Sequence, residues 1–174
     1  MDVSVYHYDA VDSTNTQCRR LAAEGVVNAV VTADCQTAGR GRMGRSFQSP
    51  AGLGLYGSVL LRSSPEDAPR IPALAATAVR RAIRRSCGLS CGIKWPNDVV
   101  VNGKKICGIL TEMSAEMTGI HYLVIGTGIN TNVEEFPEEI QSVATSLIKE
   151  LGEKVNRAEL IAACLKYFEE YYEK

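Results

Sequence analysis

The chain has 174 residues, of which 45% are hydrophobic and 22% are charged, and its formal net charge is −1. These values are typical of a soluble globular domain and exclude a disordered chain, and no apolar run reaches the roughly 20 residues of a membrane-spanning helix. The first residues lack a basic and an apolar segment, so we expect no signal peptide, a cytoplasmic location and six reduced cysteines.

Local patterns predict an alternation of strands and helices along the chain. The expected strands lie at residues 3–8, 29–35, 55–61, 93–95 and 121–127, with two further β-rich runs on either side of Asn102-Gly103. The expected helices lie at about 14–24, 69–88, 142–151 and 156–173, the last one capped by Asn156. Asn102-Gly103 is a strong signal for a two-residue hairpin turn. Strands that mostly follow one another in antiparallel runs, with helices between them, favour an α+β fold.

Residues 37–50 form a segment rich in glycine and arginine, T-A-G-R-G-R-M-G-R-S-F-Q-S-P. Glycines let the backbone approach a ligand closely, and arginines present donor forks suited to phosphate and carboxylate. The glycine spacing also matches dinucleotide-binding and P-loop motifs, but both require a helix directly after the glycines, which Pro50, Gly52 and Gly54 prevent. We therefore predict a mobile loop that binds an anion, with a solvated loop of incidental charge as the alternative.

Two lysines, Lys94 and Lys105, lie in apolar strands. Strict alternation beyond the Asn102-Gly103 turn predicts that Lys105 shares a face with Cys107 and Ile109. A lysine on an apolar face is costly unless an anion meets it, so we predict that both lysines bind an anion. The alternative is a lysine that reaches water from a strand end.

Several other positions are weaker signals. Asp98 could form a turn, pair with a lysine or orient an incoming amine. The small polar residues Ser13, Thr14 and Asn15 could cap the first helix or bind polar atoms of a ligand, and Gln36, where the second strand enters the loop, could also bind such atoms. Gly126 and Gly128 would allow close approach of a flat group, and Asn130 could bind an adenine edge. The single spaced pair Cys87 and Cys91 is too weak a signal for zinc, so we expect no fixed metal site.

In chain order these motifs are S-T-N, Q-T-A-G-R-G-R-M-G-R, K-W-P-N-D, K-K-I-C-G-I-L-T-E and G-T-G-I-N. Together they closely resemble the catalytic domain of biotin protein ligases over essentially the whole chain. The resemblance implies an α+β fold like that of class II aminoacyl-tRNA synthetases and biotin ligases, with a mixed, largely antiparallel sheet and flanking helices. It implies that residues 1–174 are one catalytic domain without the helix-turn-helix and SH3-like domains common in the family.

The resemblance also implies a two-step reaction. Biotin and ATP with magnesium first give biotinyl-5′-AMP, and a lysine of a biotin carboxyl carrier domain, such as that of acetyl-CoA carboxylase, then takes the biotinyl group. A homodimer is possible, and no DNA or membrane partner is expected. The alternatives are a lipoate-type ligase of the same fold, a non-catalytic biotin- or carrier-binding module, and an arginine-loop nucleic-acid binder, although the loop lacks interleaved stacking aromatics.

Roles carried over from the family fall on three sets of residues. The expected catalytic residues are Arg42, Lys105, Lys94 and Asp98. The expected biotin contacts are Ser13, Thr14, Asn15, Gln36, Gly39, Arg40, Gly41, Arg42, Lys105, Gly108, Gly126 and Gly128. The expected nucleotide contacts are Arg40, Arg42, Arg45, Phe47, Asn130 and Lys94. Phe47 stands where relatives often carry tryptophan.

Overall fold

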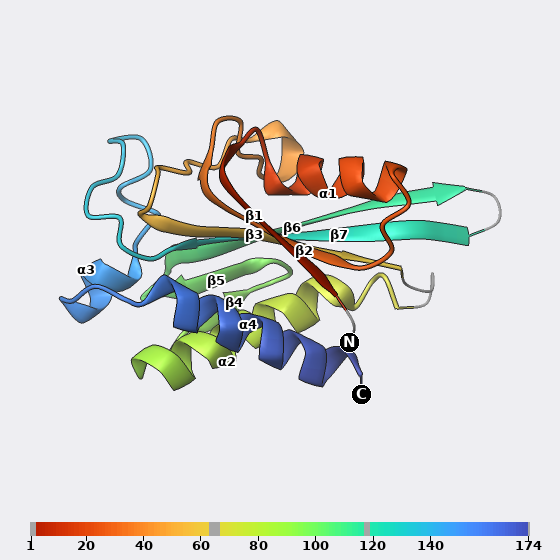
Figure 1. Ribbon diagram of the computed structural model, residues 1–174. Coiled ribbons are helices and arrows are strands. Elements are labelled where there is room, and N and C mark those ends of the chain that lie inside the picture. Colours follow the sequence, from red (N-terminus) through yellow and green to blue (C-terminus); the bar gives the residue numbers. More distant parts are fainter. Residues whose placement is uncertain (1–2, 63–66, 117–118, 174) are drawn as a thin grey trace.

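An open sheet of seven strands forms the centre of the computed structural model, which describes residues 3–62, 67–116 and 119–173 (Figure 1). The strands are β1 (Ser4–Val11), β2 (Ala29–Gln36), β3 (Gly54–Leu61), β4 (Gly92–Lys94), β5 (Asp98–Val101), β6 (Lys104–Glu116) and β7 (Gly119–Asn130). Their order across the sheet is β1-β2-β3-β7-β6-β5-β4. Only the pair β1–β2 is parallel, and the other neighbours are antiparallel. The sheet is therefore mixed and largely antiparallel, as predicted.

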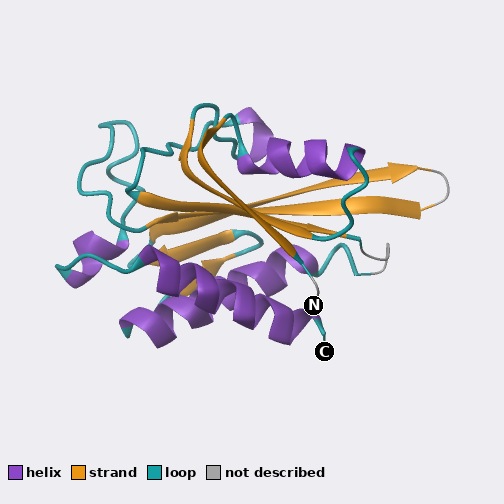
Figure 2. Ribbon diagram, in the orientation of Figure 1, coloured by secondary structure: helices purple, strands orange, loops and turns teal. Residues whose placement is uncertain are grey.

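Helices cover the two faces of the sheet unequally (Figures 1 and 2). The helices are α1 (Thr14–Ala23), α2 (Ile71–Cys87), α3 (Leu147–Leu151) and α4 (Arg157–Tyr172), with one 3₁₀ turn, η1 (Arg42–Gly44). The larger core lies between the sheet and the helices α2 and α4, and a smaller one lies under α1. Because α1 packs over β2, β3 and β7, the part of the same sheet face formed by β6 is left to the glycine-arginine loop. Within the described ranges, no helix has both the length and the apolar character needed to cross a bilayer.

The turn and cap signals act as the sequence predicts. Asn102 and Gly103 have φ angles of 50° and 79°, as a two-residue hairpin turn between antiparallel strands requires. Helix α2 ends where Gly88 adopts the left-handed conformation. The side chain of Asn156 accepts hydrogen bonds from the backbone N–H groups of the first turn of α4.

The helix expected over residues 142–151 is wrong in its first half. Helix α3 begins only at Leu147, because Ser146 is its N-cap and accepts a hydrogen bond from Lys149 N. The preceding residues pair instead with the start of β6. Lys105 N donates to Val143 O at 2.8 Å, and Thr145 N donates to Lys105 O at 2.9 Å. Pairing with a strand thus holds this segment outside the helix.

The pairing of β5 with β6 contains a bulge that reverses one prediction. Val99 faces Cys107 but Val100 faces Lys105, so β6 carries one extra residue, Ile106, at this point. Cys107 and Ile109 are buried in the larger core, whereas the Lys105 side chain lies on the other face, against a cavity. The expectation that Lys105 shares their face is therefore wrong, since strict alternation assumes an uninterrupted ladder.

Candidate functional site

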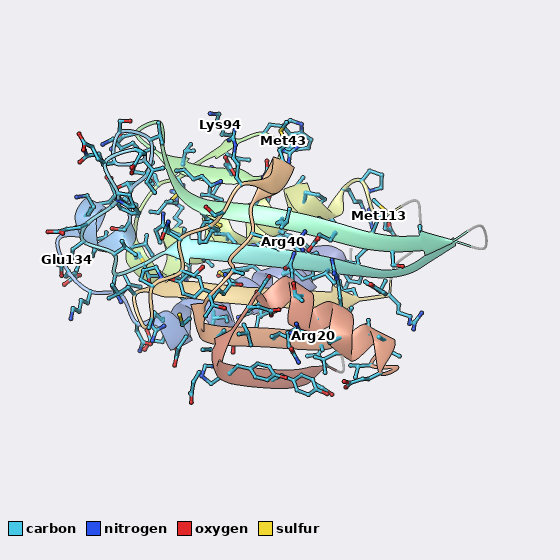
Figure 3. The ribbon with its side chains drawn as sticks, turned by 90° about the horizontal axis from the view of Figure 1, so that it is seen from above. Arg20, Arg40, Met43, Lys94, Met113 and Glu134 are labelled. Carbon is cyan, nitrogen blue, oxygen red and sulfur yellow. The ribbon has the colours of Figure 1, made fainter. Side chains whose placement is uncertain are left out.

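A cavity of about 250 Å³ lies on the α1 face of the sheet, between the first turn of α1, the glycine-arginine loop and strands β5, β6 and β7. The loop crosses over β6 and β7, with Arg40 above the strands and Met43 further along the loop (Figure 3). The predicted site residues that line the cavity are Ser13, Thr14, Asn15, Gln36, Arg40, Gly41, Arg42, Arg45, Phe47, Asp98, Lys105, Gly108, Gly126 and Gly128. The fold thus gathers residues from four distant parts of the sequence into one cavity.

The first turn of α1 brings small polar groups to the cavity. Thr14 N donates to Gln36 Oε1 at 2.9 Å, and Gln36 Nε2 donates to Ser49 Oγ at 2.9 Å. Ser13 is the N-cap of α1 and is buried, yet its side chain makes no cap hydrogen bond. The Ser13 hydroxyl is therefore available to a ligand, whereas Thr14 and Gln36 already hold each other in place.

Asn15 is buried beside these groups and is fully engaged. Its Nδ2 donates to Glu112 Oε2 at 2.9 Å and to Leu110 O at 3.2 Å, while Ser58 Oγ lies 2.6 Å from its Oδ1. A Cβ atom added to Gly126 would lie 2.2 Å from Asn15 Oδ1. The glycine at 126 is therefore required by the close approach of Asn15.

Lys105 supplies a cation at the β5–β6 side of the cavity. Its Nζ lies 2.9 Å from Asp98 Oδ1, a buried oxygen that makes no other aligned hydrogen bond. A Cβ atom on Gly108 would lie 2.8 Å from Lys105 Cε, so the lysine side chain lies across this glycine. Of the three roles left open for Asp98, the structure has it paired with a lysine.

The glycine-arginine loop folds back on itself as a small hairpin. Gly41 N donates to Arg45 O at 2.7 Å, and Phe47 N donates to Gly39 O at 2.8 Å. Gly39 does not line the cavity, but a Cβ there would lie 2.4 Å from Phe47 O, so glycine is needed to close the hairpin. Met43 at its tip adopts φ 56° and is 91% exposed.

Two arginines tie this hairpin to the sheet. Arg42 Nη1 donates to Asn97 Oδ1 at 2.7 Å, and Arg40 Nη1 lies 3.0 Å from Glu112 Oε1. Sequence reasoning missed both partners, Asn97 and Glu112. A pattern that indicates Glu112 was present in the sequence. Gly108, Leu110 and Glu112 occupy every second position of β6 and therefore share one face, and Gly108 and Leu110 line the cavity.

Besides Gly39, two predicted site residues do not line the cavity. Lys94, at the end of β4, is exposed and does not line the cavity (Figure 3). Asn130 is buried, and its Nδ2 donates to Thr145 O at 3.1 Å, which holds the segment before α3. In this structure Asn130 therefore has a structural hydrogen bond in place of a cavity contact.

Four of the six cysteines are buried: Cys18, Cys91, Cys107 and Cys164. Burial raises the pKa of Cys18 to about 12 and that of Cys91 to about 11. Burial also raises the pKa of Cys107, which packs beneath the cavity in the larger core. Such thiols are poor nucleophiles at neutral pH, because the thiolate is the reactive form.

Comparison with known proteins gives one consistent family. Residues 9–130 match the model of the biotin/lipoate A/B protein ligase family. The bifunctional ligase/repressor BirA of Bacillus subtilis is 43% identical over 173 residues, covering 97% of this chain and 53% of that protein. The biotin–[acetyl-CoA-carboxylase] ligase of Paracoccus denitrificans is 38% identical over 123 residues, covering 68% and 51%. The chain therefore spans about half the length of these curated relatives.

Solved structures agree with the sequence comparison. The biotin protein ligase of Aquifex aeolicus in complex with biotin and ATP has a TM-score of 0.83 and 35% identity, with 96% of this chain and 69% of that chain covered. The Leishmania major biotin protein ligase in complex with biotinyl-5-AMP has a TM-score of 0.77 and 28% identity, covering 95% and 73%. The predicted fold, that of biotin ligases and class II synthetases, is confirmed.

Proposed function

The chain belongs to the biotin/lipoate A/B protein ligase family, with the fold of the biotin protein ligase catalytic domain, and on this premise we propose that it activates biotin with ATP. In the proposed reaction a biotin carboxylate oxygen attacks the α-phosphorus of ATP, and the bond to the leaving pyrophosphate breaks. The product is biotinyl-5′-AMP. The amine of a carrier lysine then attacks the acyl carbon, AMP leaves, and biotin is joined to the carrier by an amide.

The observation that supports this proposal most is the separation of polar and cationic groups along one cavity. Leu110 pairs with Gly126, beside Asn15, and Gly108 pairs with Gly128, beside Lys105. Two residues along a strand span about 6.6 Å. A ligand with a neutral polar ring at one end and a carboxylate at the other matches this arrangement, as biotin does.

The cations suit the first step, which brings a carboxylate to a phosphate of like charge. Preset cations lower such a barrier by stabilising the charge that develops in the transition state. Lys105 is held by Asp98 and Arg42 by Asn97, so both groups are positioned before a ligand arrives. We propose that the ligand's carboxylate and α-phosphate replace Asp98 as the partner of Lys105.

This exchange gives Asp98 a role in the second step. Once Lys105 turns to the acyl-phosphate, the Asp98 carboxylate loses its cation and can accept a proton from an attacking amine. Asp98 begins β5, at the side of the cavity where Lys105 lies. The proposal therefore gives Asp98 the positioning and deprotonation of the carrier lysine.

The nucleotide is proposed to lie under the loop. Phe47 packs on Gly128, where a Cβ would lie 2.6 Å from its ring, and meets Tyr56 edge-on at 6.4 Å between ring centroids. Arg40, Arg42 and Arg45 line the same cavity. ATP enters as its magnesium complex, and no protein ligand for the metal is proposed. A loop held over the acyl-phosphate also protects it from water.

The partner of the second step is proposed to be a biotin carboxyl carrier domain, in keeping with the names of the relatives. Other relatives are named bifunctional ligase/repressors, so the expectation that DNA is not a partner stays a prediction. The expected homodimer, the single-domain organisation and the cytoplasmic location stay predictions as well.

Mass spectrometry tests the proposal directly. The protein is incubated with MgATP and biotin, and biotinyl-5′-AMP and pyrophosphate are measured, with lipoate and octanoate in parallel. We expect an adenylate to form with biotin and not with lipoate or octanoate. An adenylate with lipoate but not biotin would indicate the lipoate-type alternative, and biotin binding without any adenylate would indicate a non-catalytic module.

A further inference from the structure

We infer that Glu112 is a positioning residue that anchors the glycine-arginine loop above the cavity and couples the loop to Asn15. Glu112 lies in β6, opposite Val124, and its side chain is 19% exposed. One carboxylate oxygen lies 3.0 Å from Arg40 Nη1, and the other accepts a hydrogen bond from Asn15 Nδ2 at 2.9 Å. A single carboxylate thus joins the loop, the first turn of α1 and the sheet. The inference rests on the proposed function only in taking biotin as the ligand.

The link to Asn15 fixes the orientation of its amide. A carboxylate only accepts hydrogen bonds, so Asn15 must present its NH₂ group to Glu112 and its oxygen to Ser58. Since the amide oxygen only accepts, the Ser58 hydroxyl donates to it. Ser58 Oγ also lies 2.7 Å from Thr14 Oγ1, so the chain of contacts continues into the polar end of the cavity.

From Thr14 the contacts return to the loop from its other end. Thr14 N donates to Gln36 Oε1 and Gln36 Nε2 to Ser49 Oγ, both at 2.9 Å. Ser49 Oγ donates to Phe47 O at 3.1 Å, and Phe47 N donates to Gly39 O at 2.8 Å. The residue after Gly39 is the arginine that pairs with Glu112. The polar groups and the loop therefore form one closed circuit, in which Glu112 is the only carboxylate.

This geometry separates the tasks of two loop arginines. The Arg40 guanidinium meets the sheet carboxylate, while Arg42 meets the neutral amide of Asn97. Among the described residues Arg42 has no carboxylate partner, so its charge remains for an anion that enters the cavity, whereas that of Arg40 is already neutralised by Glu112. Arg40 therefore acts mainly as the loop's anchor, and Glu112 is its fixed point.

The test compares Glu112→Gln with the wild-type protein. Glutamine keeps the size and an acceptor oxygen for Asn15 but removes the charge that holds Arg40. Because the arginine is half exposed, we expect a modest effect, a rise of roughly 3- to 10-fold in the KM for biotin in adenylate formation. We expect kcat to stay within about 2-fold, since the groups at the reacting atoms are unchanged. Trypsin should cut faster after Arg42 and Arg45, with and without biotin.

Two further variants make the test specific. Arg40→Gln should give a comparable rise in KM, and the double variant should show no more than Glu112→Gln alone. Glu112→Gln already removes the Arg40 ion pair, together with the longer 3.7 Å contact between Glu112 and Arg19. Glu170→Gln is the matched control. It removes a carboxylate that lies 3.4 Å from Arg81 Nη1, on helix α4 at the other face of the sheet. This control should leave both KM and loop cleavage unchanged.

An unchanged KM and cleavage rate in Glu112→Gln, or additive effects in the double variant, would overturn the inference. So would an equal change in the control. Arg40→Gln alters only a loop side chain, so a wild-type KM in that variant overturns the inference even if Glu112→Gln does not fold. If the wild-type protein forms no adenylate, the proposed function fails. The rate of tryptic cleavage of the loop without ligand would still test whether the contact between Glu112 and Arg40 anchors the loop.

Discussion

Lys105 Nζ lies 2.9 Å from Asp98 Oδ1, so this cavity cation is paired with a carboxylate of the protein before any ligand arrives. An anionic ligand must compete with that carboxylate. The two side chains should consequently have opposite effects on binding, although they form one ion pair.

We expect Lys105→Ala to weaken adenylate binding by about 10- to 100-fold, because charge-assisted hydrogen bonds worth roughly 1.5–3 kcal/mol are lost. Asp98→Asn removes the competitor, so biotin should bind as well as before or a few-fold more tightly, while transfer to a carrier lysine slows. Calorimetry measures binding, pyrophosphate release measures the first step, and carrier mass measures the second. Equal slowing of the first step in both variants would contradict the division of roles.

Ser13 and Asn156 are both helix N-caps, but only Asn156 makes side-chain cap hydrogen bonds. Ser13→Ala should therefore leave the melting temperature nearly unchanged while biotin binds roughly 2- to 10-fold more weakly, because a neutral hydrogen bond is worth about 0.5–1.5 kcal/mol. Asn156→Ala should lose about 1 kcal/mol of unfolding free energy without affecting biotin. Thermal denaturation and calorimetry on both variants check this, and a large loss of stability in Ser13→Ala would count against a ligand role.

Gly108 and Gly126 line the same cavity but meet different atoms. An added Cβ at 108 would meet the flexible end of Lys105 at 2.8 Å, which can move aside. At 126 it would meet the fixed amide of Asn15 at 2.2 Å. Gly108→Ala should impair adenylate formation with little loss of stability, whereas Gly126→Ala should destabilise the fold by about 1–3 kcal/mol. Urea denaturation of both variants, beside activity, distinguishes them, and equal stabilities would refute the argument.

Four buried cysteines should resist labelling in the native protein. Burial raises the pKa of Cys91 to about 11 and those of Cys18 and Cys164 to about 12, and it raises that of Cys107 as well. At pH 8 only about one thiol in a thousand or fewer is then ionised at Cys18, Cys91 and Cys164. A thiol reagent at pH 8 should label Cys35 and Cys87 first, and all six only after unfolding. Rapid native labelling of Cys18 would contradict the burial.

The pH dependence of stability has a definite sign for the same residues. Each thiol is an acid whose pKa is higher in the folded than in the unfolded state, so folding favours the protonated form. The resulting stability is present below the unfolded value near 8.5 and is lost as pH rises toward the folded value. The melting temperature should therefore fall between pH 8 and pH 10.5, and Cys18→Ala should reduce the size of that fall.

Local signals in the sequence predicted most of the fold. The Asn102-Gly103 turn, the Asn156 cap and the order of strands and helices were all predicted correctly, because each depends on a few neighbouring residues. The helix expected from residue 142 was wrong in its first half, since pairing with Lys105 overrides local preference there. That pairing joins segments about 40 residues apart and leaves no local signature.

The sequence predicted some parts of the site correctly and others wrongly. Small polar and glycine-arginine motifs identified most residues that line the cavity, because their chemistry is unusual for their position. The face of Lys105 was predicted wrongly, since a bulge cannot be read from alternation. Glu112 was missed because a single glutamate in a strand is normally interpreted as facing solvent. Its contacts with Arg40 and Asn15 become visible only in the folded structure.

The extra residue at Ile106 makes the length of a strand segment as important as its composition. Removing Ile106 would give a regular ladder with Val99 opposite Cys107 and Val100 opposite Lys105, so the lysine would stay on the cavity face. The larger core, however, would lose the fully buried side chain of Ile106. Substitutions at Ile106 that keep its volume should be tolerated, whereas a single-codon deletion there should lower stability while Lys105 keeps its place at the cavity.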